Sequence, residues 1–113
     1  MTRRIESIED NIQRTLAEIL PRRVKDPRVK DALYTITDVD VAKDLSSAKV
    51  FVTVQGGKET EELVMLGLRQ ASGYLRRELG KELRLRRIPR LEFIEDTSFD
   101  EADRLTKLLR DLW

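Results

Sequence analysis

The sequence predicts a small α+β domain in which a mixed three-stranded sheet carries helices on one face. Apolar residues recur at helical spacing in four segments, and two short segments alternate as strands do, with a polar turn between them. A third strand follows a pair of helices, which predicts the order helix, strand, strand, helix, break, helix, strand, helix. With 113 residues, the chain is long enough to bury a core, and we expect residues 1–113 to form one domain.

The first helix is expected over residues 3–20. Isoleucine and leucine recur at spacings of three and four from Ile5 to Ile19, which predicts an apolar stripe that packs on a sheet. Pro21 is expected to end this helix, because a proline disfavours helical backbone in the residue before it. Residues 22–30 then carry five basic residues and one acidic residue around Pro27. They predict a loop that is either an exposed connector or a second phosphate contact.

Residues 33–41 and 48–55 are expected to form an antiparallel hairpin, with turn residues at 44–47. The alternation of the first strand changes parity along its length, which predicts a bulge near Thr37 and Asp38. The residues of the second strand expected to face the core are Ala48, Val50, Val52 and Val54.

A long connection of two helices follows, over residues 59–70 and 74–87, with a break at residues 71–73. Gly73 is expected to adopt a backbone conformation that other residues resist. A third strand at residues 91–95 opens after Pro89, which is tolerated at the start of a strand.

The last segment, residues 98–113, reads as a final helix opened by a capping box of Ser98 and Glu101. The sequence leaves open whether this helix packs on the domain or stays mobile.

Composition excludes several classes of site. Lysine and arginine total 22 against 21 acidic residues, and the chain has neither cysteine nor histidine. It therefore lacks thiolate and imidazole metal ligands and the commonest general base, and we expect no metal, no cofactor and no enzyme. The N-terminus is charged and no stretch reaches transmembrane length, so we expect a cytoplasmic protein without membrane contact.

Positive charge is concentrated between Arg69 and Arg90, where eight basic residues stand against two acidic ones. In a helical projection, Leu75, Leu79 and Leu83 share one side and the basic residues spread over the other. Such a face can bind a polyanion, although basic residues late in a helix also favour the helix dipole and many charged faces are only solvated.

A helix-helix-strand unit of this kind is found in KH-type RNA-binding domains, which carry a G-x-x-G loop between the helices. Here Ala71-Ser72-Gly73 stands in that place, and in this the chain resembles the ribosome-binding factor A family. Further matching stretches run in order along nearly the whole chain. They are Asp26-Pro27-Arg28-Val29, Thr35-Ile36-Thr37-Asp38-Val39, Asp44-Leu45-Ser46-Ser47-Ala48-Lys49-Val50, Arg87-Ile88-Pro89-Arg90-Leu91-Glu92-Phe93 and the segment from Asp96 to Leu109.

The resemblance implies a type II KH-like fold and a non-enzymatic assembly factor that acts as a monomer. Its partners would be the small (30S) ribosomal subunit and its 16S rRNA, near the 5′-terminal helix, during late maturation. It would be needed most in the cold, and other assembly factors or GTPases are further candidate partners. Pro21 departs from the pattern, because the first helix of the family is expected to continue there.

Residue chemistry and resemblance together give a set of candidate RNA contacts at the break, on the basic helix and in the preceding loop. They are Ala71, Ser72, Gly73, Arg76, Arg77, Lys81, Arg84, Arg87 and Arg90, with Arg22, Arg23, Lys25 and Arg28. Few aromatic residues are available for base stacking, so recognition of shape and phosphate is expected. An interaction module that docks on a partner protein through the C-terminal helix is the alternative, and a small hydrolase is a distant third.

Overall fold

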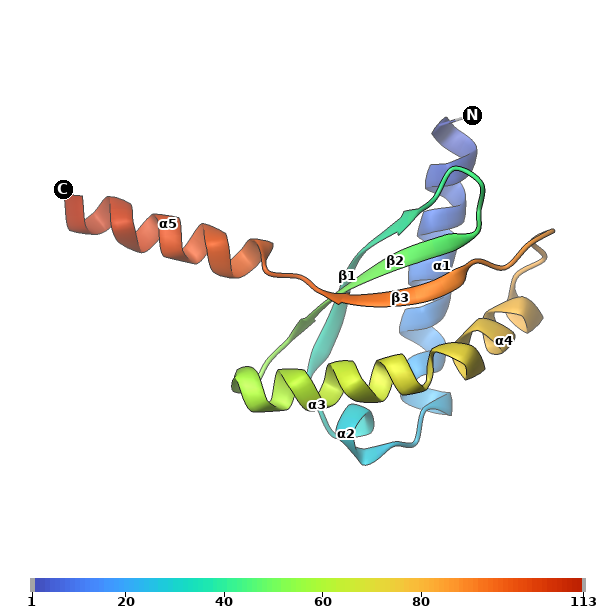
Figure 1. Ribbon diagram of the computed structural model, residues 1–113, viewed down its shortest axis with the longest axis horizontal. Helices are drawn as coiled ribbons and strands as arrows, with labels where there is room; N and C mark the ends of the chain where they lie inside the picture. Colours follow the sequence, from blue (N-terminus) through green and yellow to red (C-terminus); the bar gives the residue numbers. More distant parts are fainter. Residues whose placement is uncertain (1, 113) are drawn as a thin grey trace.

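The computed structural model describes the backbone of residues 2–112 and the side chains of residues 4–97 and 105–112. A three-stranded sheet is backed by helices, and the last helix extends away from this body (Figure 1). The α+β order expected from the sequence is confirmed, with one additional short helix. The elements are α1 (Thr2–Arg23), α2 (Pro27–Lys30), β1 (Tyr34–Val41), β2 (Ser47–Val54), α3 (Gly57–Gln70), α4 (Ser72–Glu82), β3 (Arg90–Glu95) and α5 (Ser98–Leu112).

The sheet has the order β1-β2-β3, with β1 and β2 antiparallel and β2 and β3 parallel. The register of the hairpin shifts between Ile36 and Asp38, so the predicted bulge is confirmed. In β2, Ala48, Val50 and Val52 are fully buried while Lys49 between them is exposed. One face of the sheet is therefore covered and the other is open, as the period-two pattern predicts.

The core lies between the covered face of the sheet and three helices. Ile12 and Leu16 of α1 and Leu75 and Leu79 of α4 are all fully buried. Truncating a buried leucine of this kind to alanine costs about 2–5 kcal/mol, because a cavity adds to the lost burial. Packing of α1 and α4 on one sheet fixes where the polar sides of both helices lie.

The expectation that α1 ends at Leu20 is wrong, because the helix runs through Pro21 to Arg23. Proline removes the hydrogen bond to the carbonyl of Ala17, but Ala17 lies on the exposed side of the helix, where water can replace it. Leu20 and Val24 are buried on the other side, and the Val24 N–H donates to the Leu20 carbonyl at 3.1 Å. Burial on the core side thus outweighs the local preference of proline.

The segment 22–30 is not a plain loop, because it contains the single-turn helix α2. Asp26 caps this turn by accepting a hydrogen bond from the Arg28 N–H, and Pro27 occupies the first turn, where its missing N–H does no harm. Val29 is fully buried against Gly67 of α3, so closely that a Cβ on Gly67 would stand 2.6 Å from a Val29 methyl group. The glycine is needed for close approach of a side chain to the helix.

The second helix of the crossover was expected to reach Arg87, and this is wrong: α4 ends at Glu82. Leu83 is extended, with φ −110° and ψ 131°. From there Leu83 and Leu85 are half-buried on the core while Arg84 and Arg86 point to solvent. Alternation with period two favours extended chain over helix, and it moves Arg84 and Arg87 off the helix on which they were placed.

Side chains of the helices hydrogen-bond to backbone groups of both outer strands. On β1, Gln13 donates to the Ile36 carbonyl at 3.2 Å and Glu9 accepts from the Val41 N–H at 2.8 Å. On β3, the Arg69 guanidinium donates to the Phe93 carbonyl at 3.2 and 3.3 Å. Three backbone groups at the sheet edges are thereby satisfied within the chain.

The final helix, α5, projects from the end of β3 (Figure 1). The expected capping box of Ser98 and Glu101 lies outside the described side chains. Further along, large apolar side chains face solvent. They are Leu105, Leu108, Leu109 and Leu112, which are 55–81% exposed.

Candidate nucleic-acid interface

The junction of α3 and α4 is a mild break in one helical path. Ala71 has φ −86° and ψ −2°, and its N–H donates to the carbonyls of Gly67 and Leu68. Ser72 donates from its hydroxyl to the Arg69 carbonyl at 2.8 Å, which satisfies the end of α3. No described side chain caps the start of α4, so its first N–H groups are not used by a cap.

Gly73 does not have the special backbone that was expected of it. The glycines with positive φ are Gly56 and Gly57, at the start of α3. A Cβ on Gly73 would meet only the Arg77 guanidinium, 3.9 Å away. Because Gly73 has no side chain, the helix backbone beside the exposed Arg77 is open, which leaves room for a ligand to approach it.

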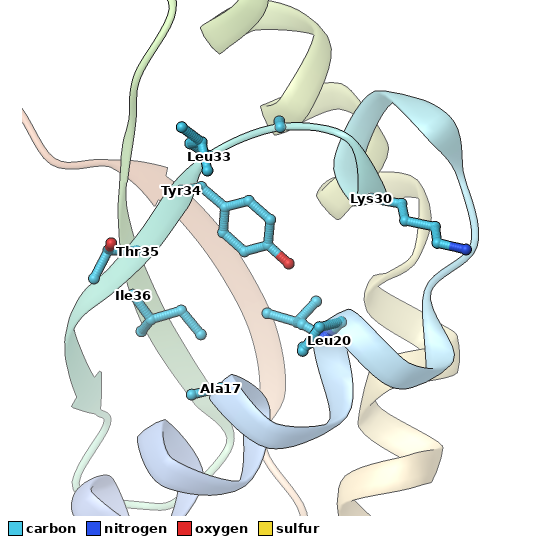
Figure 2. Close-up of a pocket in the computed structure, with 9 residues that line it drawn as sticks. Ala17, Leu20, Lys30, Leu33, Tyr34, Thr35 and Ile36 are labelled. Carbon is cyan, nitrogen blue, oxygen red and sulfur yellow. The ribbon is translucent and has the colours of Figure 1, made fainter.

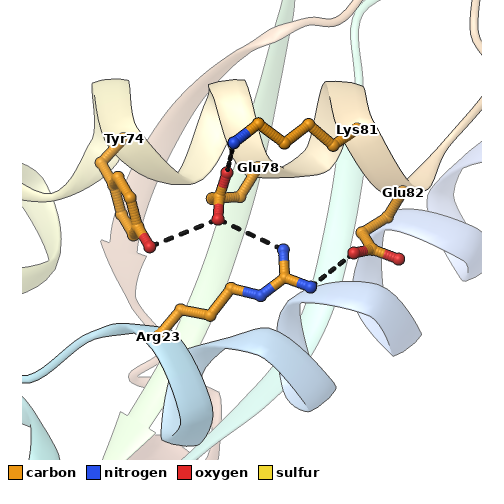
Figure 3. Close-up of polar contacts among 5 residues, drawn as sticks. All are labelled: Arg23, Tyr74, Glu78, Lys81 and Glu82. Carbon is orange, nitrogen blue, oxygen red and sulfur yellow. Dashed lines mark hydrogen bonds and ion pairs between the residues drawn. The ribbon is translucent and has the colours of Figure 1, made fainter.

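Three of the predicted contact residues are engaged in ion pairs, and we call Arg23, Arg28 and Lys81 the paired cations. Glu78 is the centre of one network, shown in Figure 3. It accepts from Lys81 at 2.9 Å and from Arg23 and the Tyr74 hydroxyl at 3.3 Å. Lys81 above all, with Tyr74 and Arg23, lowers the pKa of the Glu78 carboxyl.

Arg23 links the end of α1 to α4, because it also bonds Glu82. This contact with Glu82 is the main cause that raises the pKa of Arg23. The predicted loop residues are thus brought beside the predicted helix residues, although they are 59 positions apart in the chain.

Arg28 makes the second such link. It pairs with Asp26 and donates to Gln70 Oε1 at 2.6 Å, one residue before the break. Hydrogen bonds from Arg28 lower the pKa of Asp26. The two halves of the predicted site therefore form one surface, but its paired cations are neutralised in large part by the acids of the chain.

Arg76 is held by the backbone. Its guanidinium donates to the Ile88 carbonyl at 3.0 and 3.1 Å, which fastens the extended segment to α4. Arg69 does the same for β3, as described above. Arginines of this region thus stabilise the fold, and a count of positive charge along the sequence cannot distinguish them from ligand-binding ones.

A different group of cations is exposed and makes no hydrogen bond or ion pair with a described side chain. Four members of this group lie between the end of α4 and Arg90, the first residue of β3. We call them the open basic segment: Arg84, Arg86, Arg87 and Arg90. Within the same described part of the chain, three further cations are exposed and make no such contact: Arg77 on α4, Arg22 in the last turn of α1, and Lys25 just after α1. Arg86 was absent from the predicted set, although its place in the alternation after Leu85 marks it as exposed.

The structure has a pocket of about 470 Å³ between the end of α1 and the start of β1 (Figure 2). Its lining is mostly apolar and includes Leu20, Leu33 and Ile36, and Lys30 is the one charged residue among the described residues that line it. Burial raises the pKa of Tyr34, which points into this region (Figure 2). Such a lining does not suit a polyanion.

Within the described residues, no group of three or more acidic side chains is placed to hold a metal ion. None of the described helices is both long enough and apolar enough to cross a membrane.

Comparisons with known proteins agree with this architecture. The family model described as ribosome-binding factor A matches residues 4–109. A ribosome-binding factor A from Gloeothece citriformis is 42% identical over 110 residues, which cover 97% of this chain and 84% of the relative.

Solved structures of relatives share the fold. A solution structure of a putative ribosome-binding factor A from Thermotoga maritima is 34% identical, with a TM-score of 0.74 over 84% of this chain and 89% of that one. A homology model of the Thermus thermophilus factor, fitted into a cryo-EM map of its complex with the 30S subunit, is 32% identical. It has a TM-score of 0.64 over 80% of this chain and 93% of that one. The KH-like α+β arrangement expected from the sequence is shared by these proteins, and this chain belongs to the ribosome-binding factor A family.

Proposed function

We propose that this protein is a non-enzymatic assembly factor that binds the small ribosomal subunit through its 16S rRNA and assists late rRNA processing, most of all in the cold. The observation that carries the proposal is the open basic segment. On a chain of this family, it presents four exposed arginines that make no hydrogen bond or ion pair with a described side chain, although Arg87 also attracts the Asp44 carboxylate. Arginine binds phosphate in a bidentate manner and remains charged at every physiological pH.

Recognition of phosphate and shape follows from the side chains available. Tyr74, at 38% exposure, is the most exposed of the described aromatic residues, and its hydroxyl is used by Glu78. Base stacking on aromatic rings therefore contributes little on this surface. Phosphate contacts dominate affinity in such a case and make it strongly dependent on salt.

The site on this reading runs from the break at Ala71, Ser72 and Gly73 along the exposed side of α4. Arg77 stands over Gly73, where the surface of the helix is open to a phosphate. The paired cations lie on the same surface but are bonded to acids of the chain, so the open basic segment supplies most of the unpaired positive charge of the site.

Sedimentation with small subunits at several salt concentrations tests the proposal. A variant with Arg77→Gln, Arg84→Gln and Arg90→Gln should bind about 100-fold more weakly and lower the salt slope by about 0.7 for each phosphate that the protein no longer neutralises. Lys30→Gln, Lys49→Gln and Lys58→Gln remove the same charge from other exposed positions and should change both quantities little. Equal losses of affinity in the two variants, or affinity indifferent to salt, would overturn the proposal.

A second candidate function is favoured by α5, whose exposed leucines form an apolar face that no other described residue covers. This helix would dock the factor on a ribosomal or assembly protein. Deletion of residues 99–113 separates the two candidates. Loss of subunit association with unchanged affinity for free 16S rRNA favours docking by α5, whereas unchanged association assigns binding to the KH-like body.

A further inference from the structure

A second cavity, of about 400 Å³, opens at the end of the molecule where α1 begins. It is bounded by α1, by the turn between β1 and β2, and by the segment that follows α4. Its apolar lining is Ile5, Ile8 and Leu45, and its charged lining is Arg4, Lys43, Arg86 and Arg87. This volume lies within the range of about 300–1,000 Å³ that small organic groups occupy in proteins.

The apolar floor includes a residue with a strained backbone conformation. Leu45 has φ +63°, a left-handed conformation that residues with a Cβ rarely adopt. Its N–H donates to the Ala42 carbonyl at 2.8 Å, and its side chain is half-buried on the core beside Ile8, which is 7% exposed. The turn thereby presents a leucine where asparagine or glycine would be easier, which keeps this part of the floor apolar.

The rim has four positive charges and no acid among its described residues. All four side chains are exposed, and none makes a hydrogen bond or ion pair with a described side chain. Asp44, next to Lys43, is the acid that Arg87 attracts, and its carboxylate also accepts hydrogen bonds from the Ser46 N–H and hydroxyl. It offsets part of the charge and leaves the rim positive, with four cations to this one acid. Like charges gathered around an apolar floor repel one another until an anion binds.

We propose that this cavity holds a single unpaired nucleotide of an RNA strand, with its base on the apolar floor and its flanking phosphates on the four cations. The inference rests on the proposed function and extends it to a second contact, beyond the opposite end of α4 from the break at Ala71–Gly73. Three of the four cations are arginines, whose planar guanidinium groups both stack on bases and bind phosphate. An acidic peptide would use the charges but would leave those planar faces without a partner.

The two contacts are spaced by a rigid element. Helix α4 has 11 residues and is roughly 16 Å long at 1.5 Å per residue, and Arg86 lies four residues beyond its end at Glu82 in extended chain. A strand that follows the exposed side of α4 would therefore meet phosphate ligands at the break and a base pocket at the far end. This arrangement selects a strand with an unpaired base at a fixed distance from a backbone contact.

The test compares two RNA hairpins that differ by one bulged nucleotide, which is 2-aminopurine in the bulged form. Anisotropy gives the affinity of the full-length protein, and 2-aminopurine fluorescence reports the environment of the base. The protein should bind the bulged hairpin about tenfold more tightly and change its fluorescence. Equal affinity for both hairpins would overturn the inference.

Two variants locate the effect. Leu45→Asn removes part of the apolar floor while suiting the left-handed turn, and should abolish the preference for the bulge with little loss of affinity for the paired hairpin. Arg86→Gln with Arg87→Gln should weaken both complexes and return the 2-aminopurine signal toward that of free RNA. Lys30→Gln with Lys58→Gln is the matched control and should leave the preference intact.

These measurements can reject the pocket assignment without rejecting the proposed function. Survival of the tenfold preference in both pocket variants would overturn the pocket assignment while subunit binding stands. Binding of an acidic peptide that depends on Arg86 and Arg87, without any bulge preference, would assign the cavity to a protein ligand and overturn it too. Circular dichroism and the thermal midpoint check that each variant is folded.

Discussion

The cations of the predicted site fall into two groups with different roles. Each of the paired cations Arg23, Arg28 and Lys81 has an acid of the chain beside it. Arg23 fastens α1 to α4, Arg28 fastens α2 to α3 through Gln70, and Lys81 pairs with Glu78 within α4. The open basic segment, Arg84 to Arg90, faces solvent. The comparison shows that available charge, rather than total charge, marks a surface suited to a polyanion.

The sharpest way to break this comparison is to reverse charges in each group. Changing Arg84, Arg86, Arg87 and Arg90 to Glu should weaken binding to small subunits by on the order of 10³-fold and leave the thermal midpoint nearly unchanged. Changing Arg23, Arg28 and Lys81 to Glu should instead lower the thermal midpoint. Sedimentation and thermal unfolding measured on both variants decide whether the two groups are distinct. The same profile in both would remove the distinction.

A second prediction concerns the packing that positions the paired cations. Gly67→Ala should destabilise the fold by about 1–2 kcal/mol, because its Cβ would stand 2.6 Å from a methyl group of the buried Val29. Alanine favours an isolated helix over glycine by roughly 1 kcal/mol, and we expect the steric clash with Val29 to outweigh this gain. In the double variant with Val29→Ala the two costs should be less than additive in denaturant unfolding. Strict additivity would mean that the two residues do not constrain each other.

Within the Glu78 network, the two acids should differ. Glu78→Gln should lower the thermal midpoint more than Glu82→Gln, because the Glu78 side chain is 10% exposed and has three partners while that of Glu82 is 42% exposed. Exposed ion pairs contribute little, since water and salt screen them. Affinity for RNA should be nearly the same in both variants. A larger effect of Glu82→Gln would mean that the exposed pair of Arg23 with Glu82 stabilises the fold more than the Glu78 contacts do.

The smallest expected effect is in the dependence of stability on pH. Hydrogen bonding to Lys81 holds the pKa of Glu78 below its ordinary value of 4.5. Its contribution is therefore present above that ordinary value and is lost as the pH falls through the lowered pKa of the folded state. Unfolding midpoints between about pH 6 and pH 3 should fall less steeply in Glu78→Gln than in the unmodified chain. Part of the slope should remain, because the pKa values of Asp26 and Asp44 are also lowered.

Much of the fold could be predicted from local patterns. The parity change in the first strand located the bulge, and the helical periods located the crossover helices within a few residues. The errors also have local signals. Asp26-Pro27 is a helix start, and the alternation from Leu83 to Arg86 is extended chain. Pro21 is the exception, because only burial of Leu20 and Val24 explains why the helix continues.

The candidate site was less predictable for a physical reason. Arg28 with Gln70 and Arg23 with Glu82 are held by polar groups 42 and 59 positions away in the chain, whereas the pairs of Lys81 with Glu78 and of Arg28 with Asp26 are local. Sequence spacing contains no information on the distant contacts. The prediction that Arg84 and Arg87 lie on one helical face is wrong, because α4 ends at Glu82. The RNA contacts themselves remain predictions.

The side chains that satisfy the outer strands have a consequence for self-association. A three-stranded sheet with bare margins is a template on which further copies could grow by strand addition. Here Glu9 and Gln13 on one margin and Arg69 on the other already occupy backbone groups that an incoming strand would need. Polar side chains on helix surfaces thus oppose polymerisation of the sheet, and an apolar substitution at Glu9 would free the Val41 N–H on the β1 margin for an incoming strand while Gln13 and Arg69 keep their contacts.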